Sequence, residues 1–139
     1  MKGIVFVACL LALTHAGNTL RAYDGLEVGE SCDQKPEFIV SNFTLNPSQP
    51  VAGQSLQISI TGTFAKSASV GQINTGLRLN GNNWTNQQYN VDQAFSQWQT
   101  QTFSYNINIP QSGSYLLQVY VNRKGNQDYI ACWQTSFSC

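Results

Sequence analysis

The sequence predicts an all-β chain that folds as an immunoglobulin-like two-sheet antiparallel β-sandwich of about seven strands. Apolar residues recur at every second position, which is the period of half-buried strands. Clusters of Asn, Gly, Pro and Ser separate these alternating runs, as turns between strands require. No stretch carries a long helical pattern, and 139 residues suit one domain.

Seven strands are expected in order at 37–45, 55–64, 69–79, 83–91, 102–109, 115–122 and 129–137. The second is typical, because Leu56, Ile58 and Ile60 alternate with polar residues. The turns fall at 46–50, 80–82, 110–113 and 124–126. One helical turn is expected at 92–98, where Asp92 is placed to cap the first backbone amides.

The beginning of the chain predicts a secretory signal peptide over residues 1–16. Lys2 precedes an apolar run that is too short to cross a bilayer, and Ala16 supplies the small residue at the cut. Residues 17–31 are expected to form a loose amino-terminal arm, and residues 32–139 the sandwich domain. Two sequons, at Asn42 and Asn83, predict glycosylation on the secretory route.

The composition argues against catalysis and against nucleic acid. Seven basic residues balance seven acidic ones, so no basic excess exists to hold a phosphate backbone. The single histidine, His15, lies in the predicted signal peptide, and its removal excludes Ser-His-Asp and Cys-His machinery. Five of the seven carboxylates crowd between Asp24 and Glu37. We therefore expect no enzyme, no cofactor and no metal site.

Cleavage would leave three cysteines, Cys32, Cys132 and Cys139, in a chain that passes through an oxidising compartment. Disulfides are the expected state, and three thiols cannot all pair within one chain. The residues alone leave the pairing open.

The remaining surface is made largely of Asn, Gln, Ser and Thr, and the inward faces of the strands are rich in aromatic residues. The inward-facing aromatic residues allow two interpretations. The aromatic stripe is either a filled core or the lining of a hollow between the sheets. A dry hollow would gain about 0.8 kcal/mol for each lipid methylene that it buries.

Four segments resemble the ML lipid-recognition domain family of secreted sandwiches. They are Cys32, the run from Asn46 to Gly53 with the strand 55–64 behind it, the segment from Thr102 to Pro110 with the Tyr115 strand, and Ile130-Ala131-Cys132-Trp133. The resemblance spans residues 32–137. It implies lipid carriage and a bridge from Cys32 to Cys132, with Cys32 to Cys139 as the rival pairing.

The chain departs from the family in having no cysteine between Cys32 and Cys132. Phe95 and Trp98 stand where animal relatives have a cysteine-bounded loop, and we expect them either at the entrance of a pocket or against the sandwich edge. No family role carries over to Cys139, which leaves a free thiol or a bridge to another chain.

The sequence thus predicts a secreted or lysosomal/vacuolar protein that holds one sterol or phospholipid between its sheets. Its partners would be the lipid and a transient membrane or receptor contact, and the chain would be a monomer. The residues expected to contact the lipid are Ile58, Ile60, Phe64, Leu77, Phe103, Tyr105, Ile107, Leu117, Val119, Trp133 and Phe137. The alternative is an extracellular glycan-binding or adhesion module in which Trp84 and Trp98 stack on sugar rings.

Overall fold

The computed structural model describes residues 28–126 and 128–139 of the chain. They form eight strands: β1 (Glu30–Ser31), β2 (Phe38–Asn46), β3 (Ser55–Phe64), β4 (Ala68–Leu79), β5 (Trp84–Phe95), β6 (Thr100–Asn108), β7 (Ser114–Arg123) and β8 (Tyr129–Ser138). The predicted signal peptide and most of the predicted arm lie outside the described residues. Within those residues no helix is long and apolar enough to span a membrane.

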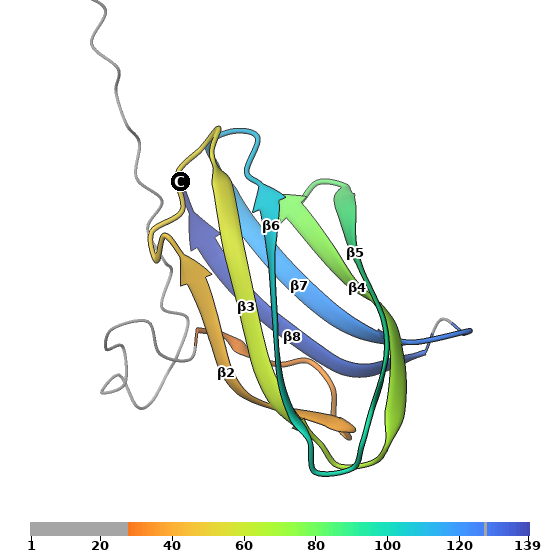
Figure 1. The fold of residues 1–139 in the computed structure, drawn as a ribbon. Coiled ribbons are helices and arrows are strands. Elements are labelled where there is room, and N and C mark those ends of the chain that lie inside the picture. Colours follow the sequence, from red (N-terminus) through yellow and green to blue (C-terminus); the bar gives the residue numbers. More distant parts are fainter. Residues whose placement is uncertain (1–27, 127) are drawn as a thin grey trace, which may run out of the picture.

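The strands make two antiparallel sheets that face each other (Figure 1). One sheet has five strands in the order β1-β8-β7-β4-β5, and the other has three in the order β2-β3-β6. Three hairpins, β2–β3, β4–β5 and β7–β8, stay within a sheet, while the remaining connections between long strands cross to the other sheet. The predicted sandwich is therefore confirmed, with the two-residue β1 in addition to the seven long strands.

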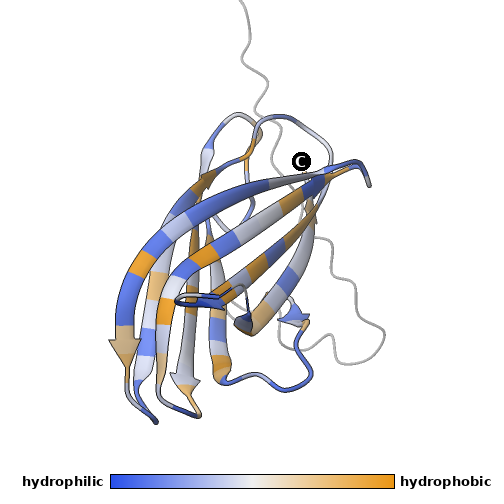
Figure 2. Cartoon of the chain, turned by 90° about the vertical axis from the view of Figure 1, so that its right-hand side faces the viewer, coloured by the Kyte–Doolittle hydropathy of each residue, from blue (hydrophilic) through white to orange (hydrophobic). Residues whose placement is uncertain are grey.

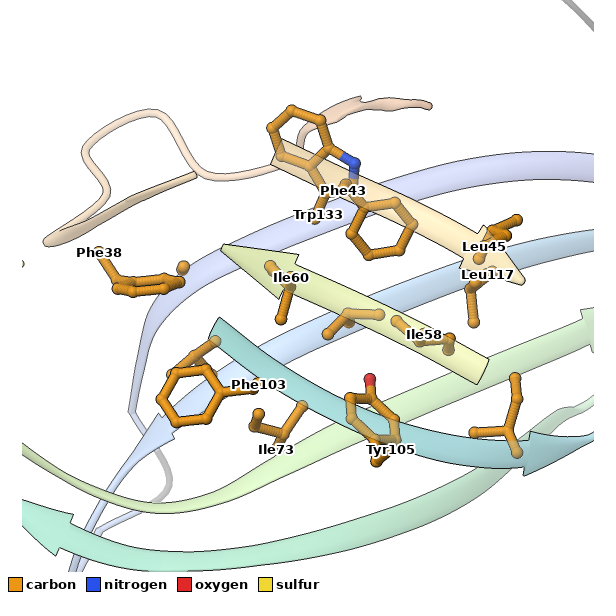
Figure 3. Close-up of a cluster of buried hydrophobic side chains, with 14 of the residues drawn as sticks. Phe38, Phe43, Leu45, Ile58, Ile60, Ile73, Phe103, Tyr105, Leu117 and Trp133 are labelled. Carbon is orange, nitrogen blue, oxygen red and sulfur yellow. The ribbon is translucent and has the colours of Figure 1, made fainter. Parts of the chain in front are cut away.

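The core lies between the sheets and follows from the period-two pattern. Hydrophilic and hydrophobic residues alternate along the strands (Figure 2). In β3 this alternation buries Leu56, Ile58, Ile60 and Phe64 and turns the intervening polar residues outward. Figure 3 shows side chains of β2, β3 and β6 pointing toward those of the five-stranded sheet.

One edge of the sandwich is closed by a strap, which we define as residues 28–37. The Val28 amide donates to the carbonyl of Phe43 in β2 (3.3 Å), and the Val28 carbonyl accepts from the Trp133 indole in β8 (2.8 Å). Farther along the strap, the backbone amide of Glu37 donates to the carbonyl of Ile130 (2.9 Å). Because the strap bonds to both β2 and β8, it joins the two sheets at this edge.

The strap also carries the disulfide, which joins Cys32 to Cys132 with 5.0 Å between the Cα atoms. This finding excludes the rival pairing of Cys32 with Cys139. Cys139 is itself disulfide-bonded, and none of the described cysteines is free, so the free-thiol alternative is wrong.

The described part of the expected arm, residues 28–31, is ordered rather than loose, because β1 pairs with β8 and Gly29 lies against Gln134 too closely for a side chain. One local prediction is wrong. The expected helical turn at 92–98 is instead the end of β5 followed by a turn. Asp92 has a positive φ of 46° and sits where the register between β4 and β5 shifts, so it belongs to a β-bulge rather than to a helix cap.

Candidate functional site

The edge opposite the strap, formed by β5 and β6, is open. No hydrogen-bonded ladder joins these strands, because β5 ends the five-stranded sheet and β6 ends the three-stranded one. They are connected at one end only, by the turn of residues 96–99. Two backbone hydrogen bonds hold that turn to β3. The Trp98 amide donates to the Phe64 carbonyl (2.7 Å), and the Phe64 amide donates to the Gln99 carbonyl (3.0 Å).

A cavity of about 280 Å³ opens at this edge, away from the turn. β5 supplies one wall and β6 the other, and the lining residues are Gln87, Gln88, Tyr89, Ser104, Tyr105, Asn106 and Ile107. The strand period explains the mixture of side chains. Tyr105 and Ile107 point toward the core, whereas Ser104 and Asn106 point outward at the rim.

Two stacked tyrosines separate the cavity from the core. The rings of Tyr89 and Tyr105 lie 5.3 Å apart at an interplanar angle of 18°. The Tyr105 hydroxyl is buried and hydrogen-bonds the Thr75 hydroxyl of β4 at 2.6 Å. Burial raises the pKa of Tyr105 above its ordinary value of 10, against a smaller opposing effect of the Thr75 hydrogen bond, so this phenol stays neutral at physiological pH.

The rim of the cavity carries three amide side chains, those of Gln87, Gln88 and Asn106. Over the part of the chain that the structure describes, none of the three makes a side-chain hydrogen bond to protein. Each amide offers a donor and an acceptor. The rim can therefore hydrogen-bond a polar group that enters the cavity.

The structure buries all eleven residues that the sequence assigns to lipid contact. Only Tyr105 and Ile107 line the cavity. Five others have no exposed surface at all: Ile58, Ile60, Phe64, Leu117 and Val119. A side chain beside a void of water size would show exposed surface, so these five pack directly against their neighbours. In this form the middle of the sandwich is filled.

The two residues expected at a pocket entrance are separated by the structure. Phe95 is buried, with its ring stacked on Phe64 at 4.7 Å and edge-on to Phe103 at 5.6 Å. Trp98 is 69% exposed in the turn after β5 and has a positive φ of 68°. Neither side chain lines the cavity between β5 and β6.

Sequence reasoning missed the amide rim. The sequence gives no sign of which amides line a cavity, because Gln87, Gln88 and Asn106 lie in runs with many other Asn and Gln residues. The available signal was the polar character of the 84–91 segment on both faces, which is typical of an edge strand that no second sheet covers.

The described residues hold no cluster of three or more His, Cys, Asp or Glu side chains that could bind a metal ion. Of the two sequon asparagines, Asn83 is exposed between β4 and β5. Asn42 lies within β2 and its side-chain oxygen is buried without a hydrogen-bond partner. The geometry of Asn83 suits a glycan better than that of Asn42.

No protein-family model matches the sequence, and neither does any curated protein. The fold, however, is similar to solved structures. A Niemann-Pick type C2 protein from Japanese carpenter ant has a TM-score of 0.56 at 10% identity, over 78% of this chain and 96% of that one. Chicken MD-1 complexed with lipid IVa has a TM-score of 0.53 at 14% identity, over 84% and 91%.

A third structure, the C-terminal domain of wzt, has a TM-score of 0.58 at 10% identity, over 84% of this chain and 77% of that one. At these identities the comparison concerns the fold. The Niemann-Pick type C2 protein and MD-1 are both ML-domain proteins. The resemblance drawn from the sequence is therefore confirmed at that level: this chain has the fold of the ML lipid-recognition domain.

Proposed function

We propose that this protein binds a lipid between its two sheets and carries it, without catalysis, to a membrane or to another protein. One observation carries the proposal: the sandwich is fastened along one edge and open along the other. The strap and the Cys32–Cys132 bridge hold β2 to β8, whereas only side chains separate the core from the cavity between β5 and β6.

The volume of the cavity indicates how a lipid would be accommodated. Pockets for small ligands usually measure about 300–1,000 Å³, so the 280 Å³ present here is small for a lipid. The guest would displace the Tyr89–Tyr105 stack and part the sheets at β5 and β6. Each buried methylene contributes about 0.8 kcal/mol toward this opening.

The predicted lipid-contacting residues are consistent with this route. Tyr105 and Ile107 form the inner wall of the cavity, and Phe103 follows on the same face of β6. In the facing sheet, Val119 is paired with Thr75, the hydrogen-bond partner of Tyr105, and Leu117 is paired with Leu77. A chain inserted past the tyrosines would thus meet mainly apolar side chains, with the Tyr105–Thr75 hydroxyl pair as a polar exception.

The disulfide and the fold support a secreted or lysosomal/vacuolar location, because disulfides persist in oxidising compartments. Asn83 is the position at which we propose a glycan. The carrier would act as a monomer with a transient membrane or receptor contact, and its ligand would be a sterol, a phospholipid or another single amphiphile.

The alternative is an extracellular glycan-binding or adhesion module, and both of its tryptophans, Trp84 and Trp98, are exposed, although they lie at opposite ends of β5. Trp84 begins β5 and Trp98 follows its end, and the strand between them has 12 residues. At roughly 3.3 Å per residue the two indoles are separated by about 35 Å along the strand. They cannot stack on one short glycan together.

The test uses the purified full chain, incubated with phosphatidylcholine vesicles that contain cholesterol and a glycosyl diacylglycerol, then separated from them and extracted for mass spectrometry. The parent should retain about one lipid per chain. Gln87→Trp places an indole in the cavity without removing a core residue, and it should lower the bound lipid at least about tenfold. Gln93→Trp is the matched control, since it lies on β5 outside the cavity and should bind as the parent does.

Two results would overturn the proposal. One is a parent protein that retains no lipid from these vesicles. The other is a Gln87→Trp variant that takes up as much lipid as Gln93→Trp, which would show that the β5–β6 edge is not the route.

A further inference from the structure

We infer that the lipid's polar group is uncharged and rich in hydroxyls, as in a glycosyl diacylglycerol, and that it lies at the rim between β5 and β6. The inference rests on the proposed function and adds the chemical class of the ligand. It is carried by the chemistry of the rim and by the distribution of charge over the fold.

None of the described residues that line the rim carries a charged side chain. Its polar groups are the amides of Gln87, Gln88 and Asn106 and the hydroxyl of Ser104, and the three amides have no protein partner among the described residues. The Ser104 hydroxyl is already bonded to Ser59 at 2.8 Å. Three neutral groups, each able to donate and accept, are thus free to bind a ligand.

The absence of charge extends beyond the rim. From Phe38 to Asn122 the chain contains only three charged residues, Lys66, Arg78 and Asp92. Lys66 is paired with Glu37 at 3.6 Å, and Asp92 with Lys124 at 3.7 Å. Both pairs lie at the end of the sandwich that is far from the cavity, where the turn between β5 and β6 is found.

Among the described residues, Arg78 is the single cation near the cavity end, and it does not line the cavity. Its neighbours in β4, Thr75 and Leu77, are buried toward the core, so alternation directs Arg78 to the outer face of the five-stranded sheet. There its guanidinium lies over the Trp84 ring, 5.1 Å from the centroid. A phosphate at the rim would find no cation on the described residues that line it.

This arrangement discriminates between classes of polar group. A phosphate that leaves water needs charge-assisted hydrogen bonds, usually from Arg or Lys, and its burial is unfavourable without them. A sugar carries several hydroxyls and no charge. Each hydroxyl can accept a hydrogen bond from an amide N–H and donate one to an amide oxygen. The single hydroxyl of a sterol would leave most of the three amides unused.

The experiment compares three lipids with identical acyl chains, each a minor component of phosphatidylcholine vesicles: monogalactosyl diacylglycerol, phosphatidylglycerol and diacylglycerol. Bound lipid is extracted from the re-isolated full chain and counted by mass spectrometry. We expect the galactolipid to be enriched over phosphatidylglycerol by about tenfold or more, since the lack of one charge-assisted hydrogen bond weakens binding by at least that factor. Diacylglycerol should fall between them.

A charge introduced at the rim should change this order. Asn106→Lys supplies the missing cation and should shift the ratio toward phosphatidylglycerol by about tenfold. Gln93→Lys is the matched control. It adds the same charge to the exposed end of β5, about 17 Å along the strand from Gln88, and should leave the ratio unchanged at moderate salt.

Each outcome bears on a distinct claim. Equal binding of all three lipids, or preference for phosphatidylglycerol, overturns the inference about the polar group and leaves lipid carriage standing. Binding of none of them overturns the proposed function and the inference together. An identical shift in Asn106→Lys and Gln93→Lys shows that general charge sets the ratio and removes the rim from the explanation.

Discussion

Tyr105 connects the core of this sandwich to its cavity. Its ring lines the cavity and stacks on Tyr89, while its hydroxyl bonds Thr75 in the interior. Thr75 is 1% exposed. A buried hydroxyl that loses its partner costs about 1–3 kcal/mol, so this single bond contributes substantially to the free energy of unfolding.

Tyr105→Phe should lower the free energy of unfolding by about 1–2 kcal/mol in urea titrations at pH 7, because Thr75 is left without a partner. The pKa of Tyr105 is raised in the folded state, so the parent should also lose stability as the pH rises above 10, where unfolding allows the phenol to ionise. The variant should lose less over that range. Tyr89→Phe, on an exposed ring, is the control, and equal stability of both variants would contradict the role of the Thr75 bond.

The strap acts as an element that fixes one edge, and Glu37 at its end links three parts of the chain. Its carboxylate pairs with Arg123 at the end of β7 and with Lys66 after β3. The hydrogen bond from Arg123 lowers the pKa of Glu37, with burial opposing it and both cations assisting. The ionised form is therefore favoured in the folded state.

Glu37→Gln should lower the free energy of unfolding by about 1 kcal/mol at pH 7, since the pairs are partly exposed. The pKa of Glu37 in the folded state is below its ordinary value of 4.5, so the stabilisation is complete above pH 4.5 and is lost as the pH falls through the lower folded value. The two proteins should converge in acid. A difference that is constant from pH 7 to pH 3 in thermal melts would contradict this account.

Most elements of this fold could be predicted from the sequence. The strand 55–64 has the predicted bounds, because its apolar residues alternate without interruption. Asp92 misled the prediction since a β-bulge and a helix cap use the same residue type. β1 has two residues and no pattern of its own, and its existence depends on β8.

The cavity was beyond sequence reasoning for a physical reason. Whether inward-facing side chains such as Ile58 and Tyr105 touch or leave space depends on the distance between the sheets, which alternation does not determine. The two side chains differ in the structure. Ile58 is packed on all sides, whereas Tyr105 lines the cavity between β5 and β6.

At the scale of the whole molecule, the Cys32–Cys132 bridge closes a loop of 100 residues that contains nearly the entire sandwich. A cross-link stabilises a fold largely by restricting the unfolded chain, and the restriction grows with loop length. The bridge also fixes the edge about which we propose that the sheets open.

Replacing both cysteines, Cys32→Ser with Cys132→Ser, should lower the free energy of unfolding by up to about 4.7 kcal/mol, the chain-entropy value for a loop of 100 residues. The double replacement is preferable to chemical reduction because Cys139 is also disulfide-bonded. Guanidinium titration measures the loss. An unchanged midpoint and slope would show that the strap hydrogen bonds alone hold this edge.

The same bridge has a practical consequence for anyone who handles the protein. A protease that cuts one peptide bond anywhere between residues 33 and 131 leaves two fragments still tied together through sulfur. Nicked material would migrate as intact protein in electrophoresis until a reductant separates the pieces. Comparing reduced and unreduced lanes would therefore reveal which loops yield first when a guest molecule spreads the sandwich.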